Sequence, residues 1–300
     1  MKLSSLLQQV KEGSKRTVAV AQAADIEVLK SVKLALHESV AHFILVGDEK
    51  GIVEAAQDAG LSLESDSVSI ASSSYETSAE TAVQLVSKGE ADVVMKGNID
   101  TKTVLKAVLN KEYGLRTGNV LSHVAVFEVP GRDRFTLLTD SGMNIEPTVE
   151  EKAQIIRNSV RVAKSIGIEE PKVAALAAVE VVNPTMQATV DAASLAVMQR
   201  RGQITDCIVD GPLAFDVAVS EEAVAHKGVV SPVAGQADIL LAPTIEVANA
   251  LYKSFVYFAG ANVAGLISGA KAPIVLTSRA DSAESKLYSL ALALLTSERD

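Results

Sequence analysis

The sequence contains no tryptophan, one cysteine and few aromatic residues. Aromatic side chains make up 4% of its 300 residues, and 37 acidic against 28 basic residues give a net charge of -9. Proteins that bind nucleic acid usually carry a basic surface and aromatic platforms on which bases stack, so we expect no nucleic-acid partner. The single cysteine, Cys207, can form neither an intramolecular disulfide nor a thiolate metal cluster, which favours a reducing, cytoplasmic environment.

The sequence also lacks a long uninterrupted hydrophobic run. Its first residues, MKLSSLLQQVKEG, are interrupted by charge, unlike a signal peptide, and the apolar stretch 239–267 is interrupted by Glu246 and Lys253. We therefore expect no membrane partner. Hydrophobic residues nonetheless form 48% of the chain, and a chain of this length can bury a large core in two domains or one large one.

Apolar runs of strand length alternate with segments of helical period. Four such runs in the first half are residues 17–22, 41–48, 67–72 and 91–97. Each is followed by an amphipathic helix pattern, which predicts βαβ units and an α/β fold with a mostly parallel sheet. Residues 120–130 and 134–142 predict two consecutive strands joined by Gly131-Arg132-Asp133, a hairpin that interrupts the parallel order.

The alternation of strands and helices restarts after Pro147. The longest helical pattern covers residues 148–168, and four strand-like runs follow it: KVAALAAV, DCIVDGPL, ADILLAPT and ANVAGLISG. The restart predicts a second α/β domain. The last strand and helix, from Ala272, fit either half. Assigning them to the first gives domains of residues 1–145 with 272–300 and of residues 146–271.

Polar residues cluster where the predicted strands end, and ligands of α/β proteins bind outside the carboxyl ends of strands. The clusters are Lys96-Gly97-Asn98 with Thr101, Ser122-His123, Asp140-Ser141-Gly142 with Asn144, Asp210-Gly211, and Thr277-Ser278-Arg279. Predicted helix starts at Asp100 and near Ser278 would bring backbone N–H groups to an oxyanion. Each cluster also has a structural interpretation. His123 fits a hydrogen-bonded core histidine, and Ser278 or Asp281 could cap the last helix while Arg279 stays solvated.

Five ordered motifs give the sequence a specific resemblance: MKGNIDT (95–101), TDSGMNIEPTVEEKA (139–153), VDGPLAFDVAV (209–219), SPVAGQADILLAPTIEVANALYK (231–253) and TSRADS (277–282). Through them the chain resembles the phosphate acetyltransferase and phosphate butyryltransferase family over essentially its whole length. The resemblance implies two α/β/α domains with an interdomain cleft, a homodimer or larger homo-oligomer, and reversible acyl transfer between acyl-coenzyme A and inorganic phosphate. It implies no metal and no cofactor, because coenzyme A is a substrate.

The resemblance also implies roles for individual residues. It places Ser278 and Arg279 at the thiol end and phosphates of coenzyme A, and Asp140, Ser141 and Asn144 along the cleft. Many acetyl enzymes have Ser-Gly where this chain has Lys96-Gly97, and the Lys-Gly form looks like the butyryl branch. The catalytic aspartate of the acetyl enzymes falls on Ser285 here, with three charged residues around it: Asp281, Glu284 and Lys286. The identity of the general base therefore stays open.

The reaction sets three chemical requirements. The thiol must lose its proton, for which we take Asp281 as the candidate base, directly or through Ser278, with Arg279 stabilising the thiolate. The oxyanion needs donors, from Ser278, Asn144 or backbone N–H groups. The leaving phosphate needs a cation and amides, which Lys96 and Thr101 at a helix start supply. Gly97 and Ser122 complete the predicted substrate-binding set. Direct transfer needs no enzyme nucleophile, so Cys207 is read as core packing.

Three alternatives remain. The first is transfer of acetyl rather than butyryl groups. The second is a sensor that binds acyl phosphate or coenzyme A without turnover. The third is a decarboxylating dehydrogenase, or a phosphate acyltransferase of lipid synthesis, on a similar frame. The dehydrogenase would need paired aspartates on a helix for a divalent metal, whereas Asp206 and Asp210 span a strand, and the sequence has no GxGxxG fingerprint.

Overall fold

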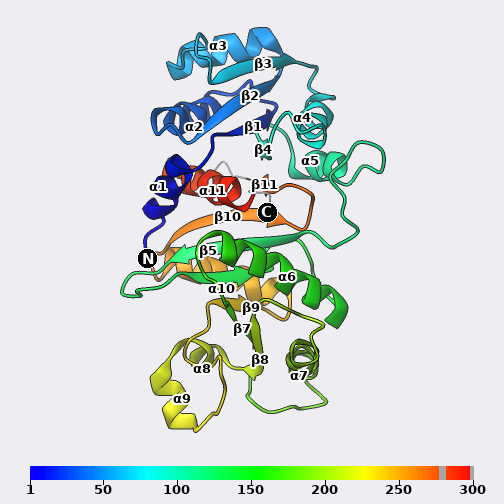
Figure 1. Cartoon of the computed structure of the whole chain (residues 1–300), viewed down its shortest axis with the longest axis vertical. Coiled ribbons are helices and arrows are strands. Elements are labelled where there is room, and N and C mark those ends of the chain that lie inside the picture. The colour runs from blue at the N-terminus through cyan, green and yellow to red at the C-terminus, as the bar shows by residue number, and fades with distance from the viewer. Residues whose placement is uncertain (277–281, 298–300) are drawn as a thin grey trace. The chain divides into compact units, whose positions relative to one another are not determined.

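The computed structural model describes residues 1–276 and 282–297, and Figure 1 shows the course of the chain. Contacts divide the chain into two compact units. The middle unit contains Met1–Lys2 and Val120–Val263, and the terminal unit contains Leu3–Asn119 and Ala264–Asp300. This division places residues 120–145 in the middle unit, whereas the predicted bounds placed them with the first domain. The reason is that residues 137–139 pair with residues 239–241 of the middle unit.

The sheet of the terminal unit has the strand order β3-β2-β1-β4-β11-β10. Its strands are β1 (Arg16–Ala21), β2 (Ala41–Gly47), β3 (Val68–Ser72), β4 (Val93–Lys96), β10 (Asn262–Ser268), which belongs to this unit from Ala264 onward, and β11 (Ile274–Val275). All adjacent pairs are parallel except β10 with β11. Residues 18–21 of β1 are completely buried, as expected of a central parallel strand with helices on both faces.

The helices of the terminal unit are α1 (Ser4–Glu12), α2 (Ile26–His37), α3 (Glu49–Ala59), α4 (Ser78–Ser87), α5 (Thr101–Val108) and α11 (Ala283–Thr296). Figure 1 shows α2 and α3 along one face of its sheet and α4 and α5 along the other. Aspartates cap the starts of α2, α3 and α5, and the side chains of Asp25, Asp48 and Asp100 each accept a backbone N–H of the first turn. The predicted helix start at Asp100 is confirmed.

The sheet of the middle unit has the order β5-β6-β9-β7-β8. Its strands are β5 (Ser122–Glu128), β6 (Thr136–Thr139), β7 (Lys172–Leu176), β8 (Ile208–Leu213) and β9 (Ile239–Leu241). The predicted hairpin is confirmed, because β5 and β6 pair antiparallel. The second hairpin strand, β6, then pairs parallel with β9. This pairing ties residues 120–145 to the middle unit, a connection that local sequence patterns do not reveal.

The helices of the middle unit are α6 (Val149–Ser165), α7 (Gln187–Arg200), α8 (Phe215–Val219), α9 (Glu221–Lys227) and α10 (Ile245–Tyr257). The long predicted helix after Pro147 is confirmed as α6, whose start has a capping box formed by Thr148 and Glu151. Apolar side chains of α8 and α10 pack on one face of the sheet, with Phe127 and Phe255 in an edge-to-face contact.

The predicted α/β fold with mostly parallel sheets is confirmed in both units. Across residues 1–276 and 282–297, no helix combines the length and apolar character needed to cross a membrane.

Candidate active site

The motif around Asp140 lies at the carboxyl edge of the parallel strands of the middle unit. Thr139 ends β6 and is paired with Leu241, which ends β9. Because β5 runs antiparallel to β6, with Val124 paired to Thr139, the start of β5 lies at this edge. Ser122 and His123 are thus the first residues of β5, which agrees with the predicted strand 120–130 but not with their grouping among the strand-end clusters. The reversed direction of β5 still brings them beside Asp140.

The carboxylate of Asp140 holds the loop together. The residue is 5% exposed, and its Oδ1 accepts backbone N–H groups of His123, Gly142 and Met143 at 3.0 to 3.1 Å. Its Oδ2 accepts the backbone N–H and the side-chain N–H of Asn144. Five N–H donors from the described residues therefore stabilise this buried carboxylate. The carboxylate therefore uses its hydrogen-bonding capacity to hold the conformation of the loop.

Asn144 and Ser122 also use their side chains within the protein. The Nδ2 of Asn144 donates to Leu121 O at 2.8 Å as well as to Asp140, so its amide has no N–H left for an oxyanion in this conformation. Ser122 is completely buried, and its Oγ accepts an N–H from Asn158 at 2.9 Å. These contacts give both residues a structural part in the loop.

Ser141 differs from its neighbours because its hydroxyl meets a histidine. Ser141 Oγ lies 2.7 Å from His123 Nδ1, and Ser141 O accepts an N–H from Asn249 of α10 at 3.4 Å. The His123 ring lies 6.0 Å from the ring of Tyr252, also on α10. Sequence reasoning placed His123 at this edge but interpreted it as a core residue. The spacing of Asn249 and Tyr252 by one helical turn was the signal for a helix face against this loop.

Lys96 and Gly97 lie at the carboxyl end of β4 in the terminal unit. Lys96 is half-buried, and its Nζ donates to Gly97 O at 3.3 Å. Gly97 donates its N–H to Ala21 O at 2.8 Å, and a Cβ at this position would lie 2.2 Å from Gln22 O. The motif therefore requires glycine because β1 approaches its backbone closely. This approach fixes the strand end from which Lys96 projects.

The predicted anion site at the start of α5 is partly filled by the protein itself. Thr101 is the exposed first residue of α5. Asp100, the N-cap, accepts from Thr103 N and from Thr103 Oγ1, at 2.9 and 2.6 Å. These bonds from Thr103 hold the pKa of Asp100 below its ordinary value. The carboxylate therefore already offsets part of the positive end of the helix, and Lys96 is the nearby cationic group of the motif.

The predicted catalytic residues Ser278, Arg279 and Asp281 lie outside the described residues. The helix that follows them, α11, has Ser282 as its N-cap, with Ser282 Oγ accepting the N–H of Ser285 at 3.1 Å. The expectation that Ser278 or Asp281 caps this helix is thus wrong, because a serine nearer to its first turn performs that role.

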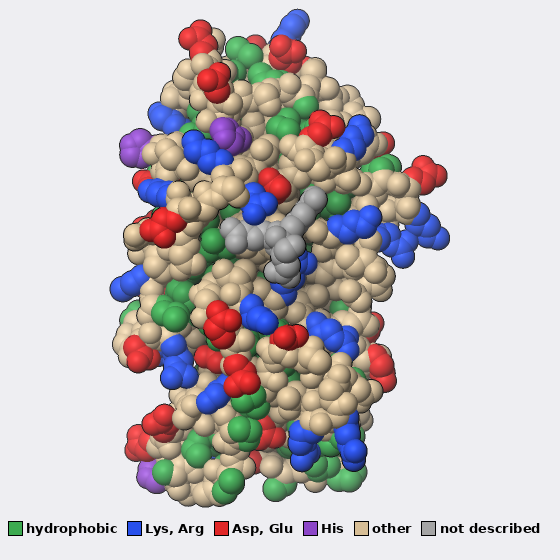
Figure 2. Space-filling view, viewed as in Figure 1, with side chains coloured by type: hydrophobic (Ala, Val, Ile, Leu, Met, Phe, Trp, Pro, Cys, Tyr) green, Lys and Arg blue, Asp and Glu red, His purple; other side chains and the backbone are tan. Residues whose placement is uncertain are grey.

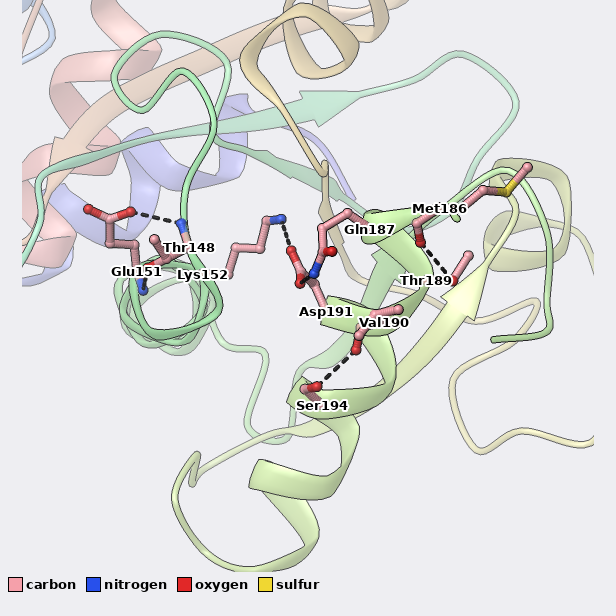
Figure 3. A network of polar contacts seen from close by, with 9 residues as sticks. All are labelled: Thr148, Glu151, Lys152, Met186, Gln187, Thr189, Val190, Asp191 and Ser194. Atoms are coloured by element: carbon pink, nitrogen blue, oxygen red, sulfur yellow. Dashed lines mark hydrogen bonds and ion pairs between the residues drawn. The ribbon is translucent and has the colours of Figure 1, made fainter. Parts of the chain in front are cut away.

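A buried ion pair that sequence reasoning missed lies at the start of two helices of the middle unit (Figure 3). Lys152 Nζ of α6 is 2.6 Å from Asp191 Oδ2 of α7, and their side chains are 6% and 8% exposed. Gln187 donates to the other oxygen of Asp191 at 2.7 Å. The pair borders a pocket of about 480 Å³ that is also lined by Pro147 and Thr244. In the sequence, the signal for this ion pair was a pair of opposite charges, each at a buried position of a helix.

The described residues contain no group of three or more His, Cys, Asp or Glu side chains arranged to hold a metal ion. Cys207 is buried, and burial, together with the charges of Asp206 and Glu170, raises the pKa of its thiol to about 11. A thiol of that pKa is a poor nucleophile at neutral pH. On the face drawn in Figure 2, acidic and basic side chains are interspersed rather than gathered in a stripe of one sign.

Comparisons with known proteins give these motifs a family. The chain is 55% identical over 299 residues to a protein of Bacillus subtilis named "Probable phosphate butyryltransferase", and the match covers 99% of each chain. It is 47% identical to a phosphate acetyltransferase of Thermotoga maritima, over 96% of this chain and 97% of that protein. The crystal structure of a branched-chain phosphotransacylase from Enterococcus faecalis is 39% identical, with a TM-score of 0.82, over 95% of this chain and 100% of that one.

The family model described as "Phosphate acetyl/butaryl transferase" matches residues 64–294, which include all five motifs. The resemblance stated from the sequence is thereby confirmed. The chain belongs to the phosphate acetyl/butaryl transferase family.

Proposed function

We propose that this chain transfers an acyl group reversibly between coenzyme A and inorganic phosphate. The observation that carries the proposal is the similarity over nearly the whole length to a protein named as a phosphate butyryltransferase. The strand-end motifs with Lys96 and Ser141 support it, because they provide a cation and a hydroxyl for anionic substrates.

In the proposed reaction, the sulfur of coenzyme A loses its proton and attacks the carbonyl carbon of an acyl phosphate. A C–S bond forms, the bond from the carbonyl carbon to the phosphate oxygen breaks, and inorganic phosphate leaves; the reverse direction exchanges these roles. We assign the thiol proton to Asp281, and the thiolate and coenzyme contacts to Ser278 and Arg279, from the family resemblance. Lys96 is the proposed cation for the phosphate.

We further propose that butyryl groups, or short chains of similar size, are preferred over acetyl groups. The support is the Lys96-Gly97 form of the first motif together with the names of the two butyryl and branched-chain relatives. The chain is also 47% identical to a phosphate acetyltransferase, so transfer of acetyl groups is the second candidate reaction. One methylene changes binding by only about 1 to 3 kcal/mol, so an assay must decide between them.

The test measures phosphate-dependent release of free coenzyme A from acetyl-, propionyl-, butyryl- and branched acyl-coenzyme A at one phosphate concentration. Trapping the product as a hydroxamate identifies the acyl phosphate. A faster release with butyryl than with acetyl supports the preference. Equal or faster release with acetyl assigns the chain to the acetyl branch. Binding of acyl-coenzyme A without any thiol release would make the chain a sensor.

We also propose a homodimer or larger homo-oligomer. The support is a set of large apolar side chains that the middle unit exposes. Val181 is 67% exposed, Val182 54% and Val230 100%. Exposed apolar side chains mark a protein interface where they join into one patch. Light scattering of the purified protein tests the assembly, and a mass of one chain of 31.4 kDa at micromolar concentration would refute it.

A further inference from the structure

His123 and Ser141 are held by the same carboxylate. The backbone N–H of His123 donates to Asp140 Oδ1 at 3.0 Å, and Ser141 follows Asp140 directly in the chain. Thr139 Oγ1 donates to His123 O at 2.8 Å. Both backbones are therefore held in place, and the 2.7 Å contact between His123 Nδ1 and Ser141 Oγ makes the direction of the hydroxyl proton depend on the tautomer of the imidazole.

The ring of His123 faces an aromatic side chain of α10. The two ring centroids of His123 and Tyr252 lie 6.0 Å apart at an interplanar angle of 58°. Ser141 is only 6% exposed, so water has little access to its hydroxyl as a hydrogen-bond partner. A buried hydroxyl beside an imidazole takes one of two states: it donates to Nδ1, or it accepts from Nδ1–H and keeps its own proton for another acceptor.

We propose that His123 is a positioning residue for Ser141: its Nδ1–H donates to Ser141 Oγ and leaves the hydroxyl proton for an oxygen of the phosphate or acyl phosphate substrate. The inference rests on the proposed function, because that function supplies the anionic substrate. An anion requires a hydrogen-bond donor. If the serine hydroxyl donates its proton to the histidine, it presents only lone pairs to the substrate, and these repel phosphate oxygens. The direction of this single bond therefore decides whether Ser141 assists or opposes binding.

The variants separate hydrogen bonding from packing. His123→Leu keeps bulk against Tyr252 and removes the donor, whereas His123→Asn places an amide N–H close to the position of Nδ1. We expect His123→Leu to lower kcat/KM for phosphate about tenfold, Ser141→Ala to lower it at least as much, and His123→Asn to stay within about threefold of the wild type. His226→Ala, at an exposed histidine of α9, is the matched control and should not change the rate.

The decisive measurement is the double variant. If His123 acts through Ser141, His123→Leu lowers kcat/KM less than about twofold further in the Ser141→Ala background. An equal loss in both backgrounds, or normal efficiency of Ser141→Ala, overturns the inference while the wild-type activity still stands. An inactive wild type refutes the proposed function first and this inference with it. Melting temperatures are measured for every variant, and if His123→Leu does not fold, Ser141→Ala and His123→Asn alone still decide.

Discussion

Two buried carboxylates of the middle unit are stabilised in different ways. Asp140 receives five N–H donors from its own loop and from His123, whereas Asp191 depends on the ammonium of Lys152 and the amide of Gln187. Asp140 keeps its hydrogen bonds as long as the loop keeps its conformation. The arrangement at Asp191 leaves an uncompensated charge as soon as one partner is removed, and such a charge is costly in a buried position.

Lys152→Met should therefore lower the free energy of unfolding by about 3 to 5 kcal/mol, because Asp191 loses its cation. Replacing both residues, Lys152→Met with Asp191→Leu, should recover most of the loss. Lys30→Met, which breaks an exposed pair with Glu27 whose side chains are 55% and 70% exposed, should change stability by less than about 1 kcal/mol. Urea unfolding measures all three. A single variant as stable as the wild type would contradict the argument.

At Lys96 the prediction concerns binding rather than stability. Lys96→Ala should raise the KM for phosphate about tenfold and change the KM for acyl-coenzyme A much less, because a charge-assisted hydrogen bond to phosphate is lost. Lys50→Ala, at an exposed lysine of α3, serves as the control. Steady-state kinetics with each substrate varied in turn checks it. An unchanged phosphate KM would assign Lys96 a structural part through its bond to Gly97.

The polar residues of the site could be located from the sequence, but their contacts could not. Asp140 and Ser141 were predicted from their position after an apolar run. That Asp140 is saturated by donors depends on the antiparallel pairing of β5 with β6, which brings His123 from 17 residues away. Lys152 and Asp191 are 39 residues apart on two helices. Only the packing of those helices brings the two charges together.

Among the elements, strands were easier to predict than the turns that join them to helices. The central parallel strands are buried on both faces and therefore appear as continuous apolar runs. Past Val275 this signal ends. The predicted turn at 277–279 suggested a helix start near Ser278, but α11 begins at Ala283 with Ser282 as its cap. Several serines and aspartates there are capable caps, and sequence alone does not rank them.

The turn after β4 gives a prediction at the scale of elements. Gly97→Ala should destabilise the protein by about 2 to 4 kcal/mol, because the new Cβ would lie 2.2 Å from Gln22 O and 2.6 Å from Ala21 O, backbone atoms of the last residue of β1 and the residue after it. Gly142→Ala, where the nearest atom is a side-chain carbon at 3.7 Å, should cost less than about 1 kcal/mol. Thermal unfolding compares the two, and equal losses would refute the steric explanation.

For the whole molecule, the question is whether the acyl group passes through the protein. The only cysteine among the 300 residues is Cys207, which is buried and has a pKa raised to about 11. At pH 8 about one thiol in a thousand would be ionised. An acyl-cysteine intermediate is therefore disfavoured for two reasons: the thiol is inaccessible to substrate, and it is almost entirely protonated. Direct transfer between two bound substrates avoids both obstacles.

Direct transfer predicts a sequential kinetic mechanism. Initial rates measured with both substrates varied should give double-reciprocal lines that intersect, since acyl-coenzyme A and phosphate must be bound together before either product leaves. Exchange of labelled coenzyme A into acyl-coenzyme A should require phosphate, and Cys207→Ala should keep most of the activity. Parallel lines, phosphate-independent exchange or a labelled acyl group on the protein would instead show a covalent intermediate. If that label survived in Cys207→Ala, the acyl carrier would be a hydroxyl, an amine or a carboxylate, and Ser141 would be the first residue to replace.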